Sequence, residues 1–144
     1  MSTSLRGVIV DCHKAQLKTL VPNGEVWRTR AEPPSNTRPC FTLYDDSETV
    51  QTLTVHPAPR PQQRELQLVV VGWCLYDVGD PELAEQRMDA LALSIEQTIT
   101  PRAGTDDLQL QGIEKLYDDV EPRSSSVTLR YLIKYRTTER NPVA

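Results

Sequence analysis

The sequence has few of the residues and motifs that enzymes and metalloproteins depend on. It has two histidines and three cysteines, and only Cys12 and His13 are adjacent. Residues next to each other on a helix point about 100° apart, so Cys12 and His13 cannot pair as nucleophile and base. We expect Cys12 on the apolar stripe and His13 exposed beside it. No set of His and Cys residues has zinc-site spacing, so we expect no enzyme activity, no metal and no cofactor.

Other familiar motifs are also missing. The chain has no glycine-rich phosphate loop and no GxSxG sequence, and its paired aspartates lack the spacing of a calcium loop. No apolar run is long enough to span a bilayer, and the start MSTSLRG lacks the apolar region of a secretory signal. A net charge of −4 is unusual for a dedicated nucleic-acid binder. Three scattered cysteines without a CxxC pair favour free thiols in a reducing compartment.

Two segments have the periodicity of amphipathic helices. The first, Ser4 to Leu20, has apolar residues at helical spacing and ends at Pro22. The second begins at Asp80-Pro81, where aspartate caps the helix and proline occupies its first position. Its expected buried stripe contains Ala84, Met88, Leu91, Ala92, Ile95 and Ile99.

Five segments have the composition of strands: Glu25–Arg30, Cys40–Tyr44, Glu65–Tyr76, Ile113–Tyr117 and Ser126–Thr137. The polar segment Asp45 to Gln63 is predicted to be a long connection with one brief strand inside it. The element order α-β-β-β-α-β-β predicts an α+β domain. We expect a mostly antiparallel sheet of about five strands, with the two helices packed on one face. Residues 1–137 would form this single domain, and 138–144 a flexible tail.

Two strands have faces of special interest. The strand Glu65–Tyr76 begins with alternating polar and apolar residues and becomes continuously apolar, which predicts burial on both faces at that end. Either the protein's own helices or a second copy would cover it. The last strand carries Arg130, Lys134 and Arg136 on one face. This face is either simply solvated, or meets an acidic partner or a phosphate backbone.

Four features of the chain together resemble the tail terminator proteins of long-tailed phages, the lambda-type minor tail protein U family. They are the N-terminal helix SLRGVIVDCHKAQL, the strand PCFTLYDD, the strand RELQLVVVGWCLY leading into DPELAEQRMDALALSIE, and the strand SVTLRYLIKYRT after an acidic turn. Their order and spacing agree over nearly the whole chain. The long segment Asp45 to Gln63 departs from the family, in which this connection is shorter.

The resemblance implies a structural virion protein made in the bacterial cytoplasm. Six copies would form a ring at the head-proximal end of the tail, stop polymerisation of the tail tube protein and present a surface to the head-tail connector protein. DNA would pass through the lumen without sequence-specific binding, and no membrane would be involved. The expected interface residues are Val69, Val71, Trp73, His56, Pro57 and Pro59. The expected lumen or acidic-partner face contains Arg130, Lys134 and Arg136.

Two other functions remain open from the sequence. A head-tail connector or neck protein of the same phage needs similar interfaces. A small intracellular ligand-binding α+β domain needs a pocket with converging polar groups, and the sequence shows no cluster of such groups.

Overall fold

The computed structural model describes residues 4–21, 24–34, 39–54, 59–75, 80–118 and 124–138. These residues form a five-stranded sheet and two helices, in the chain order α1, β1, β2, β3, α2, β4, β5. The helices are α1 (Leu5–Lys18) and α2 (Pro81–Thr98). The strands are β1 (Val26–Arg28), β2 (Cys40–Thr52), β3 (Pro61–Leu75), β4 (Asp107–Asp118) and β5 (Ser124–Thr138). The predicted α+β class and order of elements are confirmed.

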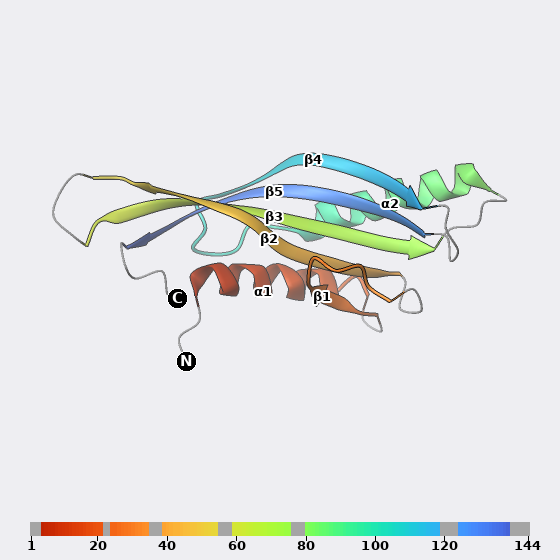
Figure 1. The fold of residues 1–144 in the computed structure, drawn as a ribbon, viewed down its shortest axis with the longest axis horizontal. Coiled ribbons are helices and arrows are strands. Elements are labelled where there is room, and N and C mark those ends of the chain that lie inside the picture. Colours follow the sequence, from red (N-terminus) through yellow and green to blue (C-terminus); the bar gives the residue numbers. More distant parts are fainter. Residues whose placement is uncertain are drawn as a thin grey trace.

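The strands lie in the spatial order β1-β2-β3-β5-β4. Four long strands run side by side along the longest axis of the molecule, and β4 forms one edge (Figure 1). Their three pairings are antiparallel, whereas the short β1 pairs in parallel with Phe41 to Leu43 of β2. The sheet is therefore mixed, which differs in detail from the mostly antiparallel sheet predicted, because β1 and β2 run in the same direction.

Both helices cover the same face of the sheet. Ser125 and Tyr135 share one face of β5, because ten residues separate them. Ser125 donates a hydrogen bond to Met88 of α2, whereas Tyr135 contacts Glu48, which also binds Arg6 of α1. The core between the helices and this face includes the following residues: Ile9, Leu17, Phe41, Leu43, Leu66, Leu68, Val70, Met88, Ile95, Leu129 and Ile133.

Each helix has a side-chain cap at its start. The hydroxyl of Ser4 accepts a hydrogen bond from the amide of Gly7, and the carboxylate of Asp80 accepts one from the amide of Leu83. The predicted cap at Asp80 and the buried stripe of α2 are confirmed, except that Leu91 is only half-buried.

The predicted positions of Cys12 and His13 on α1 are wrong. The buried residues of this helix are Gly7, Ile9, Val10, His13 and Leu17, so His13 lies at the centre of the stripe and Cys12 on its flank. The Nδ1 of His13 lies 2.8 Å from the side-chain oxygen of Gln16, one helical turn away, whereas its buried Nε2 has no hydrogen-bond partner among the described residues.

The predicted long connection Asp45 to Gln63 is also wrong for most of its length. β2 continues to Thr52, and β3 begins at Pro61. The paired backbones form this part of the hairpin, and backbone hydrogen bonds require no apolar side chains. For the same reason β4 begins at Asp107, six residues earlier than predicted.

Candidate assembly surface

The edge strand β4 is the least covered part of the sheet. None of its residues 107–117 is buried. Its large apolar side chains are nevertheless numerous: Ile113 is 46% exposed and Leu116 is 63% exposed, and Leu110 and Tyr117 are each more than one third exposed. An edge strand with exposed apolar side chains on both faces offers a partner both backbone hydrogen bonds and apolar surface.

Contacts with α2 hold one end of β4 against the helix. The ammonium of Lys115 binds the carboxylates of Glu85 and Asp89, and the hydroxyl of Tyr117 donates to Glu85. These interactions raise the pKa of Lys115, with the hydrogen bond to Asp89 as the largest cause. Lys115 is therefore a fixed cation among acidic side chains. Leu93 follows Glu85 and Asp89 in the same row of α2 and is itself exposed.

The sheet has a second uncovered edge on β2. Because β1 pairs only as far as Leu43, the rest of β2 is paired on one side alone among the described residues. Arg30, which follows β1, occupies part of this edge. Its guanidinium donates to the carbonyls of Asp45 and Asp46 and lies 4.7 Å from the centroid of the Tyr44 ring. The segment Ser47–Thr52 has no strand on its outer side within the part of the chain that the structure describes.

Two of the predicted interface residues on β3 are already buried within one chain. Val69 is 1% exposed and Val71 is 7% exposed in the isolated chain, so no second copy is needed to cover them. Val69 lies in register between Tyr44 and Arg130 on the face opposite the helices. These two valines offer a partner little surface.

The remaining predicted interface residues are scattered. The indole of Trp73 is half-buried and donates a 3.1 Å hydrogen bond to Thr42. Pro59 is exposed at the end of the β2–β3 connection. His56 and Pro57 lie outside the described residues, as does the predicted tail beyond Thr138. The strand Ile113–Tyr117 was predicted, but its place at the uncovered edge of the sheet was not, because residue types alone do not show which strand is outermost.

The three predicted basic residues do share one face, opposite the helices. Arg136 lies 3.2 Å from Asp106, and Lys134 lies 4.0 Å from Glu65. Arg130 is exposed and makes no ion pair with the other described residues. It borders a cavity of about 340 Å³ that also includes Gln67, Val69 and Gly112. A β-carbon added at Gly112 would meet no atom within 4 Å, so this part of the face is open.

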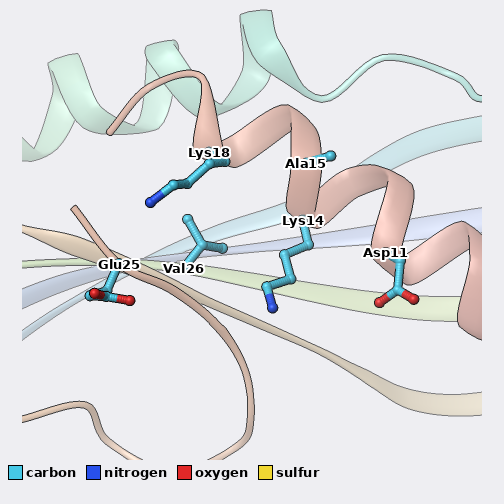
Figure 2. Close-up of a pocket in the computed structure, with 6 residues that line it drawn as sticks. All are labelled: Asp11, Lys14, Ala15, Lys18, Glu25 and Val26. Carbon is cyan, nitrogen blue, oxygen red and sulfur yellow. The ribbon is translucent and has the colours of Figure 1, made fainter. Parts of the chain in front are cut away.

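A larger cavity, of about 580 Å³, lies between α1 and β1 (Figure 2). The described residues that line it are Asp11, Lys14, Ala15, Lys18, Glu25 and Val26. Lys18 also donates to the carbonyl of Gly24. Its charges of both signs suit a salt-dependent contact with another protein surface more than a reaction, because these side chains include no thiol, hydroxyl or imidazole.

The described part of the chain has neither a membrane-spanning helix nor a metal-binding cluster. No helix in it is both long and apolar enough to cross a membrane, and no group of three or more His, Cys, Asp or Glu residues is placed to hold a metal ion. The surface best suited to a function is therefore the pair of uncovered edges on β4 and β2. Comparison of the sequence with protein-family models and with curated proteins found no match.

Proposed function

We propose that this protein is a structural ring protein of a phage tail. It caps the head-proximal end of the tail tube, stops the tube from growing and provides the surface that joins the head. The observation that carries its self-assembly is β4, an edge strand of twelve residues with no buried side chain in residues 107–117. The phage-tail assignment rests on the sequence resemblance to tail terminators.

The fold supports the assembly part of this proposal in a second way. A closed ring needs two different surfaces on each copy, because each contact joins one surface to another. The uncovered edges of β4 and β2 lie at opposite sides of the sheet, as such a contact requires.

The direct test is the mass of the purified protein by light scattering, with and without tail tube protein, together with electron micrographs. A ring with a central hole, and tubes of uniform length in its presence, are expected. A protein that stays monomeric with tube protein and leaves tube length uncontrolled would exclude the proposal.

A pair of matched substitutions tests the role of β4. Leu116→Lys places a charge on the most exposed apolar side chain of β4, whereas Leu75→Lys places one on a 43% exposed leucine at the end of the interior strand β3. We expect the first substitution to weaken ring formation at least tenfold in concentration and the second to have little effect. Equal behaviour of the two variants would remove β4 from the assembly surface.

A further inference from the structure

The direction of the backbone groups on both uncovered edges follows from two hydrogen bonds. The amide of Leu53 donates to the carbonyl of Pro61 on β3, at 3.0 Å. Backbone groups alternate in direction along a strand, so those of Glu48 and Val50 point away from β3, toward the uncovered side. Val50 is 47% exposed, which makes it the large apolar residue of this edge.

The same reasoning applies to β4. The carbonyl of Lys134 on β5 accepts from the amide of Asp106, at 2.8 Å, so the even-numbered residues of β5 bond toward β4. Arg130 is one of these, and its partner is Gly112. The next residues that point outward from β4 are therefore Ile113 and Lys115.

The two sides of the sheet also differ in charge. On one side, α1, β1 and β2 together have no net charge, because Arg6, Lys14, Lys18 and Arg28 balance Asp11, Asp45, Asp46 and Glu48. On the other side, α2 and residues 107–117 of β4 carry a net charge of −4, from Glu82, Glu85, Asp89, Glu96, Asp107 and Glu114 against Arg87 and Lys115. Two β4 edges would repel each other, whereas a β4 edge meets no net charge of the same sign at a β2 edge.

We propose that β4 of one copy pairs antiparallel with Ser47–Thr52 of β2 in the next copy, with Ile113 opposite Val50. This inference rests on the self-assembly in the proposed function and specifies its contact. The alignment joins two exposed apolar side chains and places Lys115 opposite Glu48. The pairing is antiparallel because β2 and β4 run in opposite directions within one sheet. The four long strands thus become one unit of a continuous sheet.

The alignment also has the stagger that a closed sheet requires. Ile113 is paired with Leu129 of β5, which is paired with Val70 of β3. Val50 is paired with Arg64 of β3. The offset of six positions from Arg64 to Val70 spans about 20 Å, and the four strands of one copy are about 19 Å wide. If all copies lie at the same height in a ring, their strands are therefore tilted by about 45° from the ring axis, which is at the upper end of the range for closed barrels.

The direction of this stagger selects the face that lines the ring. Consider the sheet viewed from the helix side, with β5 running upward. In a strand of L-residues, the backbone groups of residues whose side chains face the viewer point to the right, so β3 and β2 lie to the right of β5. In this view Val50 lies higher than Ile113. Each copy is then added to the right and upward. If the helices lie on the outside of the ring, the strands tilt relative to the ring axis in the direction that the normal twist of sheets favours. With the helices inside, they would lean in the opposite direction. The lumen would therefore be lined by the face of Arg130, Lys134 and Arg136.

Two proline substitutions test the contact. Val50→Pro and Ile113→Pro each remove one outward amide and no hydrogen bond of the chain's own sheet. We expect each variant alone to be monomeric by light scattering. Mixed together they should form a 1:1 dimer, because the intact β4 of the first meets the intact β2 of the second. The controls Val50→Thr and Ile113→Thr keep the amide and should still form rings.

The other outcomes separate the alternatives. Rings from either proline variant would exclude the β4–β2 pairing alone. A homodimer of Val50→Pro that gains nothing on mixing would show a two-fold β4 contact, again against the pairing. Wild-type protein that stays monomeric with tube protein would exclude both the pairing and the proposed function.

A cysteine pair keeps the inference testable if a proline variant fails to fold. Paired residues in an antiparallel sheet have Cα atoms about 5.5 Å apart, within reach of a disulfide. We expect Val50→Cys combined with Ile113→Cys to give a ladder of covalent multimers on oxidation. Either single substitution should give none beyond the background of the native cysteines. Absence of the ladder from assembled rings would exclude this register.

Discussion

Glu48 is the strongest single test of how the chain holds the far end of its sheet. Its side chain is 7% exposed, and one carboxylate oxygen accepts from Arg6 at 2.8 Å and from Arg64 at 3.0 Å. The other oxygen accepts from the hydroxyl of Tyr135, which is buried. One carboxylate thus joins β2, β3, β5 and α1. We expect Glu48→Ala to be among the most destabilising polar substitutions in the protein.

The magnitude follows from what the substitution leaves behind. Removing one partner of a buried ion pair costs about 3–5 kcal/mol, but Arg6 is partly exposed and can be rehydrated. We therefore expect a loss of about 2–4 kcal/mol in the free energy of unfolding, measured by urea titration. For a chain of this size that lowers the melting temperature by about 5–15 °C.

Two controls make the reasoning refutable. Glu48→Gln keeps an acceptor for Tyr135 and should cost less than Glu48→Ala. Arg6→Met removes only the exposed partner and should cost less than about 1 kcal/mol. A loss below about 1 kcal/mol for Glu48→Ala, or a larger loss for Arg6→Met, would show that this network does not hold the sheet together.

Two further predictions concern the core. Burial lowers the pKa of His13, opposed by the hydrogen bond with Gln16 and reinforced by Arg102. The unfolded chain then binds this proton near pH 6.5 and the folded chain only at lower pH, so stability should fall as pH drops below about 6.5, by at most about 1.4 kcal/mol per unit. His13→Gln should remove this slope between pH 5 and 7, and an unchanged slope would exclude His13 as its source. In Gly72→Ala the added methyl would lie 2.7 Å from Cδ2 of Leu91, so we expect a loss of about 1–3 kcal/mol in urea titration. Leu91→Ala in the same chain should recover part of that loss, and no recovery would place the strain elsewhere.

The sequence predicted the parts of the fold that apolar side chains specify. The capped helix after Asp80 and the alternating strand that contains Arg130 were both found where expected, because burial leaves a periodic pattern. The far half of the β2–β3 hairpin was missed because its strands are held by backbone pairing, which leaves no such pattern. His13 was misplaced because its residue type gives no sign of burial, although in the fold it is fully buried with one hydrogen bond, between its Nδ1 and Gln16.

The candidate surface could be predicted only in part. Arg130, Lys134 and Arg136 were correctly placed on one face, since alternation along a strand fixes this. The burial of Val69 and Val71 could not be foreseen, because it depends on which strands lie on either side of β3. The β2 edge was equally hidden, since it exists only because the parallel strand β1 is short.

The exposed strand β4 also has a consequence for when assembly can occur. Within the described residues, β4 is held by one ladder of hydrogen bonds to β5 and by the contacts of Lys115 and Tyr117 with α2, and all of these border solvent. Such a strand opens at a free-energy cost well below that of global unfolding, so its amides should exchange early with deuterium in the free chain. Pairing on its second side would close it. The fraction of chains with an ordered β4 would then depend on protein concentration. In dilute solution this edge strand would be partly open until other copies are present.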